Sequence, residues 1–144
     1  MRLSPDLSAE MRRILSLAWP VALTSLNWTI LHVTDGESGD GDPEEIAASL
    51  GQLRTNDGSV VVMNIHVSAL GADTIKFPSS ESGLPDNYAK MLFRMSSALP
   101  PHIAAFARDK GYTVSPESRG YMFNAEAGEI VDFFDIGTRA SQLR

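Results

Sequence analysis

The sequence predicts an α/β protein in which a parallel, doubly wound (Rossmann-like) sheet is flanked by helices. Residues 29–34 are apolar and β-branched, and the run is too short for a helix. Residues 59–67 form the strongest strand pattern of the chain, and their almost continuous apolar start is typical of a strand covered on both faces. A helical pattern at residues 43–54 separates the two runs. Strand, helix and strand within about forty residues make a βαβ unit, whose crossover should be right-handed.

The N-terminal part, residues 1–28, is predicted to be a helix over about residues 8–19 followed by a connector. Pro20 ends this helix. Arg12 and the apolar run at residues 14–23 together resemble a signal peptide. Acidic residues precede the arginine, and the run is too short for a membrane span, so we expect a short buried helix or adventitious sequence, with a cleaved signal as the alternative. The remainder, residues 29–144, is expected to form one domain.

An acidic, glycine-rich loop follows the first strand and leads into the helix at residues 43–54. Asp42 is a good N-cap, and Pro43 suits the first helical position. Helical spacing places Ile46, Ala47, Leu50 and Leu53 on the inward face. Asp35 stands at the carboxyl end of the first strand, which is where open α/β sheets keep their ligand sites.

The second half of the chain alternates between turns, helices and one short strand. Residues 56–58 are a turn signal, and residues 69–85 are predicted to be a long loop. Asp86 can cap a helix over residues 87–99 that buries one face. The residues of that face are Tyr88, Leu92, Met95 and Leu99.

The final elements follow a proline pair. A helix over residues 101–110 should end at Gly111, because glycine is the usual residue just past a helix. Residues 120–124 are predicted to form a short strand, and residues 127–139 a closing helix. That helix is expected to turn Ile130, Phe133, Phe134 and Ile136 partly inward.

Composition excludes several classes of protein. The chain has 144 residues and a formal net charge of −6, with its basic residues scattered, so we expect no nucleic-acid partner. The apolar fraction of 43% is that of an ordinary globular domain rather than a disordered chain. Cysteine is absent, which excludes disulfides and thiolate metal sites.

The acidic loop is the main candidate for chemistry. Asp35 could contribute to a Mg²⁺ or Mn²⁺ site, with Glu37, Ser38 and Asp40 as weaker candidates, because hard cations prefer oxygen ligands. The alternative is that Asp35 and Asp42 only terminate the strand and cap the helix, and that the remaining acids face solvent. The spacing does not fit an EF-hand. A haloacid-type phosphatase is also excluded, because Val33 stands where the nucleophilic aspartate would be.

Histidines and serines give weaker signals. His32 and His66 lie in strands that should be neighbours, so a paired ligand site is conceivable, although hydrogen-bonded sheet histidines are more common. There is no Gly-x-Ser-x-Gly elbow that would indicate a serine hydrolase. No catalytic residue is therefore assigned, and we expect a protein that is not an enzyme.

Several segments, in order along the chain, resemble von Willebrand factor type A domains of a bacterial, cytoplasmic type. They are residues 30–38, 64–68, 77–80, 91–97, 120–125 and 134–139. The resemblance covers only the C-terminal half of such a domain, and Asp35 matches the family's downstream metal-site aspartate. The upstream Asp-x-Ser-x-Ser motif is missing. Asp6 to Glu10 imitates it, but no apolar strand precedes Asp6.

The resemblance implies a non-enzymatic protein-binding module with a partial, MIDAS-like site that binds Mg²⁺ or Mn²⁺ weakly. In the intact family an acidic side chain of a partner protein completes the coordination of the ion. The missing N-terminal half of the domain is a second possible partner. One alternative is a metal-dependent hydrolase or phosphatase that uses the acidic loop. Another is a metal-free interaction fragment, which could form a homo-oligomer through an open sheet edge. No membrane partner is expected.

Overall fold

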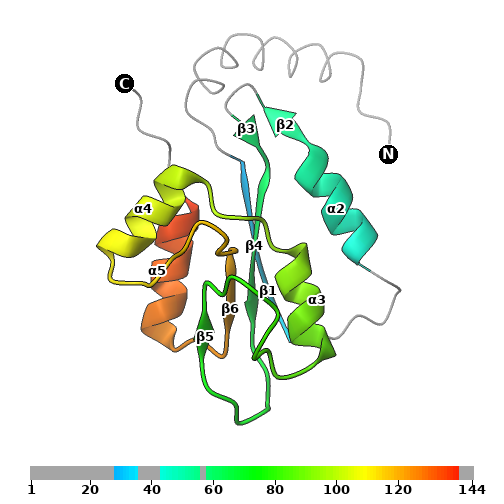
Figure 1. The fold of residues 1–144 in the computed structure, drawn as a ribbon, viewed down its shortest axis with the longest axis vertical. Coiled ribbons are helices and arrows are strands. Elements are labelled where there is room, and N and C mark those ends of the chain that lie inside the picture. Colours follow the sequence, from blue (N-terminus) through cyan, green and yellow to red (C-terminus); the bar gives the residue numbers. More distant parts are fainter. Residues whose placement is uncertain (1–27, 36–42, 56–57, 140–144) are drawn as a thin grey trace, which may run out of the picture.

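The computed structural model describes residues 28–35, 43–55 and 58–139, and their core is a four-stranded sheet (Figure 1). The strands are β1 (Thr29–Thr34), β4 (Val61–His66), β6 (Tyr121–Phe123) and β5 (Ile75–Lys76), in the spatial order β1-β4-β6-β5. β1 and β6 both pair with β4 in parallel, and β5 pairs with β6 antiparallel. The expected α/β class with a mostly parallel sheet is confirmed. Except for Trp28, the predicted N-terminal helix and connector lie outside the described residues.

Helices cover both faces of the sheet. On one face α2 (Glu44–Gln52) packs beside α3 (Asn87–Met95), and both contact β4. On the other face α4 (Pro101–Asp109) packs beside α5 (Ala127–Gly137), which also contacts β1 (Figure 1). In the described part of the chain, no helix is long and apolar enough to cross a membrane.

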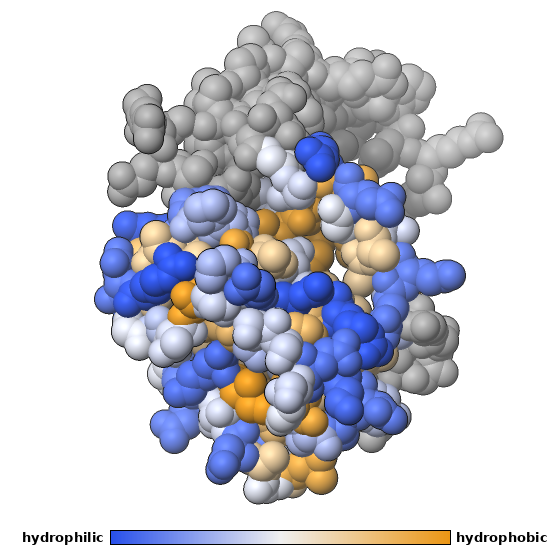
Figure 2. All heavy atoms as spheres, viewed as in Figure 1, coloured by the Kyte–Doolittle hydropathy of each residue, from blue (hydrophilic) through white to orange (hydrophobic). Residues whose placement is uncertain are grey.

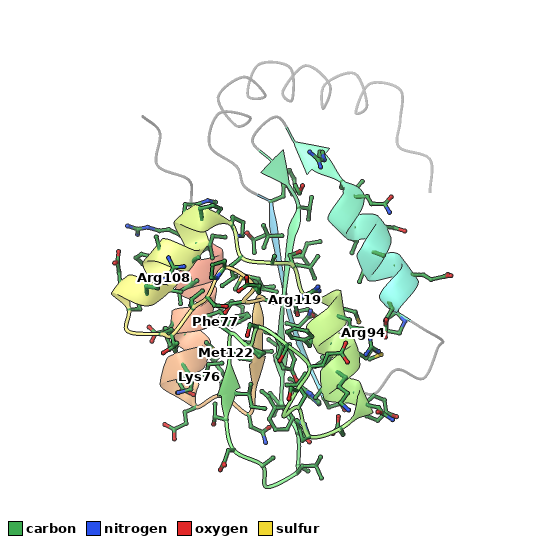
Figure 3. The ribbon with its side chains drawn as sticks, viewed as in Figure 1. Lys76, Phe77, Arg94, Arg108, Arg119 and Met122 are labelled. Atoms are coloured by element: carbon green, nitrogen blue, oxygen red, sulfur yellow. The ribbon has the colours of Figure 1, made fainter. Side chains whose placement is uncertain are left out.

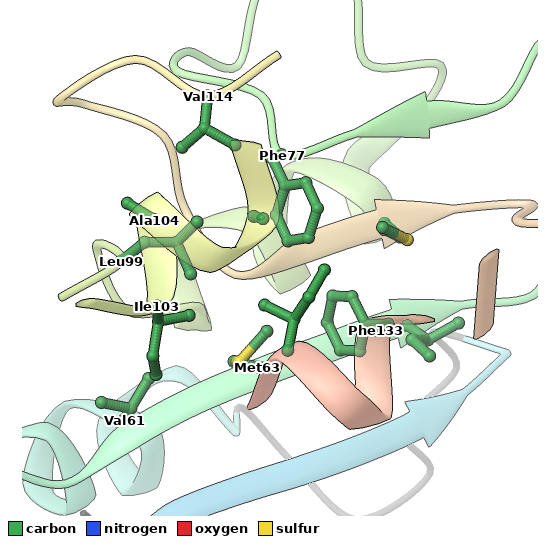
Figure 4. Packing of buried hydrophobic residues seen from close by; sticks show 12 residues of the cluster. Val61, Met63, Phe77, Leu99, Ile103, Ala104, Val114 and Phe133 are labelled. Carbon is green, nitrogen blue, oxygen red and sulfur yellow. The ribbon is translucent and has the colours of Figure 1, made fainter. Parts of the chain in front are cut away.

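β4 is the central strand, and all six of its residues are buried. Because strand side chains alternate, Met63 and Ile65 point to one face and join Phe133 and Ile103 in the main core cluster (Figure 4). Asn64 lies on the opposite face and donates a hydrogen bond to Ser96 Oγ at 2.9 Å. The prediction of a strand covered on both faces is confirmed for β4, although the strand is shorter than residues 59–67.

The apolar, β-branched composition of residues 29–34 predicts a buried strand, but no residue of β1 is fully buried. It lies at the edge of the sheet, and Val33 is 49% exposed and Ile30 37% exposed. Composition alone does not separate an edge strand from a central one, because both favour β-branched residues. Elsewhere the visible surface is largely hydrophilic, with apolar residues in separate spots (Figure 2).

α2 is shorter and less buried than predicted. It begins at Glu44, with Pro43 rather than Asp42 at the N-cap, and Asp42 lies outside the described residues. Ala47 is buried, whereas Ile46 and Leu53 are exposed, because the helix packs through a narrow face. The predicted end of the helix instead forms β2 (Arg54–Thr55), a hairpin partner of β3 (Gly58–Ser59).

α3 also ends earlier than predicted, because the chain after it joins the sheet. Ser97 accepts a hydrogen bond from Val62 N–H through Oγ and donates its own N–H to the carbonyl oxygen of Val62. The N–H of Gly120 then bonds to the carbonyl oxygen of Ser97. Ser97 thereby extends the hydrogen-bonded sheet between β4 and β6. Tyr88, predicted to be buried, is exposed.

The long loop after β4 contains structure that the sequence does not reveal. It includes the two-residue strand β5, which leads into Phe77, a buried residue with a φ of 48°. The Phe77 ring stacks on Phe133 at 5.8 Å between centroids. α4 agrees closely with its prediction, and Gly111 after it has a φ of 95°. In α5, Phe133 and Ile136 are buried as predicted, but Phe134 is 38% exposed.

Candidate functional site

A pocket of about 490 Å³ lies at the carboxyl ends of β1 and β4. The residues that line it come from the end of β1, the end of β4 with the loop that follows, and the start of α3. They are Asp35, His66, Val67, Ser68, Ala69, Leu70, Asp86 and Tyr88. Carboxyl ends of parallel strands meet at one edge of a sheet, which is where α/β proteins commonly bind ligands. Asp35, the main site residue predicted from the sequence, is among them.

His66 connects the two strand ends beneath this pocket. Its Nε2 lies 2.9 Å from the carbonyl oxygen of Asp35, and its Nδ1 lies 3.1 Å from the hydroxyl of Tyr121. A carbonyl oxygen only accepts, so Nε2 carries the proton, and in the neutral ring Nδ1 accepts from Tyr121. Burial, with a smaller contribution from the charge of Asp86, raises the pKa of Tyr121, which keeps this hydroxyl a donor.

Asn124 fixes the loop that forms the pocket wall. Its Oδ1 accepts from the N–H of Ser68 at 2.7 Å, and its Nδ2 donates to the carbonyl oxygen of Leu70 at 2.9 Å. Thr74 Oγ1 donates to the main-chain oxygen of Asn124 at 2.8 Å. Asn124 adopts a φ of 47°, a conformation that asparagine tolerates better than most residues. The sequence predicts residues 120–124 only as a short strand and does not indicate these hydrogen bonds of Asn124.

The described lining of the pocket is acidic. Asp35 and Asp86 contribute carboxylates, and no lysine or arginine is among these lining residues. Asp86 Oδ1 also accepts the N–H of Ala89 at 2.8 Å, which confirms Asp86 as the N-cap of α3. Two carboxylates favour a cation over phosphate or a carboxylate as a ligand.

The described residues alone do not complete a site for Mg²⁺. Within residues 28–35, 43–55 and 58–139, no group of three or more His, Cys, Asp or Glu side chains could hold a metal ion. Mg²⁺ requires near-octahedral oxygen coordination and gives up its water reluctantly, so Asp35 with water ligands would bind it weakly. The weaker candidates Glu37, Ser38 and Asp40 lie outside the described residues.

The two strand histidines do not form a joint metal site. Both lie on neighbouring strands, as predicted, but His32 stands opposite Asn64, whereas His66 stands opposite Thr34. The Nδ1 of His32 donates to Asn64 Oδ1 at 3.0 Å. Both ring nitrogens of His66 have protein partners. Both histidines therefore form hydrogen bonds that connect neighbouring strands of the sheet.

Ser68, the serine in the pocket wall, does not pair with a general base. Its Oγ accepts the N–H of Leu70 at 3.2 Å, which forms a local turn. The nearby His66 cannot accept a serine proton in its present tautomer, because Nε2 donates to Asp35 and Nδ1 accepts from Tyr121. Among the described residues of the pocket, Ser68 and His66 therefore do not form a nucleophile–base pair.

Several arginine contacts outside the pocket are structural. Arg94 on α3 forms ion pairs with Glu44 of α2 and Glu81 of the preceding loop (Figure 3). Arg119 donates to the main-chain oxygens of Arg94 and Ser96 at 3.0 Å, and its guanidinium lies over the Phe93 ring. These contacts fix α3, whose first residues border the pocket, and no pattern in the sequence indicates them.

The acidic pocket thus lies at the carboxyl ends of β1 and β4, and its wall is fixed by hydrogen bonds of His66 and Asn124. Neither family models, nor curated proteins, nor solved structures give a match to this chain.

Proposed function

We propose that this chain is a non-enzymatic protein-binding module whose docking site is the acidic pocket around Asp35. In this proposal the sheet is Rossmann-like and corresponds to the C-terminal half of a von Willebrand factor type A domain. A divalent cation, Mg²⁺ or Mn²⁺, is held weakly by Asp35, and an acidic side chain of the partner protein completes its coordination. The observation that carries the proposal is the position of Asp35 in a pocket at the carboxyl ends of two parallel strands.

The charge of the pocket supports a cation-dependent partner. Asp35 and Asp86 place two carboxylates in the pocket, and the described lining residues include no lysine or arginine. A partner carboxylate would be repelled there unless a cation lies between the two surfaces. Because Asp35 alone holds the ion poorly, the ion and the partner should bind cooperatively. The ion offsets the repulsion between the carboxylates, and the partner supplies a further oxygen ligand to the ion.

The hydrogen bonds of His66 and Ser68 favour binding over catalysis. Both ring nitrogens of His66 and the hydroxyl of Ser68 take part in structural hydrogen bonds. The alternative is a metal-dependent hydrolase or phosphatase that uses the acidic loop, with metal-bound water as its nucleophile. A phosphate-ester hydrolysis assay with Mg²⁺ tests it, and we expect no turnover.

Isothermal titration of Mg²⁺ and Mn²⁺ into the full chain tests the proposal. We expect a weak, saturable signal that Asp35→Asn reduces by about tenfold or more in affinity, since the substitution removes the charged ligand. Asp73→Asn is the matched control, because Asp73 is an exposed carboxylate in the nearby loop that is not among the pocket residues.

Two results would overturn the proposal. One is a titration of Asp35→Asn that superimposes on the wild type. The other is an equal loss of affinity in Asp73→Asn, which would mean that the ion responds to general surface charge rather than to the pocket.

A further inference from the structure

We propose that the outer edge of β1 pairs antiparallel with β1 of a second copy of this chain, so that the two sheets become one. Among the described residues, the strand order places β1 at the end of the sheet with β4 on one side only. An edge strand exposes a row of main-chain donors and acceptors that another strand can pair with. This surface is separate from the acidic pocket and does not depend on its ligand.

The hydrogen bonds to β4 decide which main-chain groups face outward. The carbonyl oxygens of Trp28 and Thr34 accept from the N–H groups of Val61 and Val67 at 2.8 and 2.9 Å. Main-chain groups of a strand alternate between its two neighbours. The even-numbered residues of β1 therefore face β4, and the odd-numbered residues, Thr29, Leu31 and Val33, direct their main-chain groups to the outer edge.

This alternation limits the register of self-pairing. Hydrogen-bonded pairs must join two outward-facing residues, so a twofold axis through Leu31 gives the longest overlap of the two strands. In that register Leu31 faces its own copy and Thr29 faces Val33. Ile30 faces His32 across a non-hydrogen-bonded pair. No charged side chain occurs in β1, so a chain with a net charge of −6 meets no like charges along this contact.

β1 also lacks the features that protect edge strands from pairing. It contains no lysine, no proline and no glycine, and its residues are mainly β-branched or apolar. Val33 is 49% exposed in the single chain. Pairing would cover part of this side chain and satisfy outward-facing main-chain groups at once.

The neighbouring helix adds apolar surface on the same side. Gly137 of α5 lies against Leu31, since a Cβ on Gly137 would stand 2.6 Å from Leu31 Cδ2. Asp132 forms an ion pair with Lys110, the residue that follows α4. Asp132 therefore lies on the α4 flank of α5, opposite to the flank that faces β1. Helical geometry then places the half-exposed Phe134 on the β1 flank, beside Gly137. A twofold axis normal to the sheet brings the two α5 helices to the same face, where the Phe134 flanks face each other.

Sedimentation of the full chain over a wide concentration range tests the proposal. We expect a monomer–dimer equilibrium that Val33→Pro shifts strongly to monomer. Proline at this position removes an outward N–H and none of the bonds to β4, and prolines are tolerated on edge strands for that reason. Val33→Thr is the matched control, because it keeps the N–H and a β-branched side chain, and it should still dimerise. Far-UV circular dichroism of each variant reports whether it is folded.

Cross-linking tests the register independently. The chain has no cysteine, so Ile30→Cys and His32→Cys each introduce a single thiol. Opposed residues of a non-hydrogen-bonded pair lie about 4.5 Å apart between Cα atoms, within the range of a disulfide. A mixture of the two variants should give a covalent dimer on mild oxidation far faster than either variant alone.

The proposal fails if the wild-type chain is monomeric at every concentration, as it would be if another part of the chain covered this edge. It also fails if Val33→Pro dimerises like the wild type, or if the mixed thiols cross-link no faster than the separate ones. Because Asp35→Asn leaves the edge intact, it should dimerise normally, which separates this result from the test of the pocket.

Discussion

The Nε2 of His66 lies 2.9 Å from the main-chain oxygen of Asp35, and this contact joins the last residue of β4 to the residue that follows β1. The same ring reaches Tyr121 of β6 through Nδ1. One buried imidazole thus connects three adjacent parallel strands at the end where the acidic pocket lies. The position of Asp35 therefore depends on this buried, hydrogen-bonded histidine.

Replacing this histidine should destabilise the protein. His66→Ala removes a buried ring and leaves the Tyr121 hydroxyl without its acceptor, so we expect the free energy of unfolding to fall by about 3 kcal/mol. Urea denaturation measures the change. Tyr121→Phe should cost less, and the double variant should cost less than the sum of the two. Strict additivity would contradict the pairing of these side chains.

Asn124 should stabilise the pocket wall in two separable ways. Asn124→Ala removes the side-chain bonds to Ser68 and Leu70 and places a Cβ residue without compensation at a φ of 47°. We expect a loss of about 2–4 kcal/mol. Asn124→Gly loses the same bonds without the conformational cost and should recover about 1 kcal/mol. Equal stabilities of the two variants would show that the backbone conformation contributes nothing.

Gly120 should not tolerate a larger residue. A Cβ there would stand 2.6 Å from Met63 Cγ and 3.2 Å from Met63 Cβ, and Met63 is completely buried. Gly120→Ala should therefore lower the free energy of unfolding by about 1–3 kcal/mol. Gly128→Ala is the control, since nothing lies within 4 Å of its Cβ position in α5, and it should raise stability by up to about 1 kcal/mol. Thermal unfolding compares them, and a neutral Gly120→Ala would contradict the close approach of β6 to β4.

Stability should also depend on pH through the cluster that Asp132 of α5 forms with Lys110 and Tyr112. Hydrogen bonds from Lys110 and Tyr112 lower the pKa of Asp132 below its usual 3.8, so this stabilisation is present above that pH and is lost as the pH falls further. Burial and the bond to Asp132 raise the pKa of Tyr112 from 10.0 to about 12, so its contribution is present below pH 10.0 and is lost as the pH rises toward 12.

Asp132→Asn tests this dependence, with denaturant midpoints measured across the pH range. The variant should lose stability at neutral pH and show a flatter acid limb than the wild type. Glu117→Gln, which replaces an exposed carboxylate outside this cluster, should reproduce the wild-type curve. If Asp132→Asn retained the full wild-type acid dependence, the cluster would not be its source.

The apolar runs predict much of the fold, because burial leaves a local pattern. The three parallel strands and the two helices after the proline pair could be placed in this way. The end of α4 could be placed from Gly111, because glycine commonly follows the last residue of a helix. The sequence also places Asp35 at a strand end. Its pocket neighbour Asp86 is recognisable only as a helix cap.

Features that depend on long-range contacts could not be predicted. The two-residue strand β5 is too short for a periodic signal and forms because it pairs with β6. Exposure of β1 depends on which strand lies beside it, which its composition does not encode. The hydrogen bond from the Ser68 N–H to Asn124 Oδ1 joins residues 56 positions apart, so neither residue alone indicates it.

The most direct test of the central claim uses Mn²⁺ as a paramagnetic probe in a ¹⁵N-correlation spectrum of the full chain. We expect substoichiometric Mn²⁺ to broaden the amide signals of Val67 to Leu70, which line the pocket, and to leave those of β3 unchanged. Asp35→Asn should abolish this broadening. Broadening that is centred elsewhere, or that persists in Asp35→Asn, would contradict a cation site at Asp35.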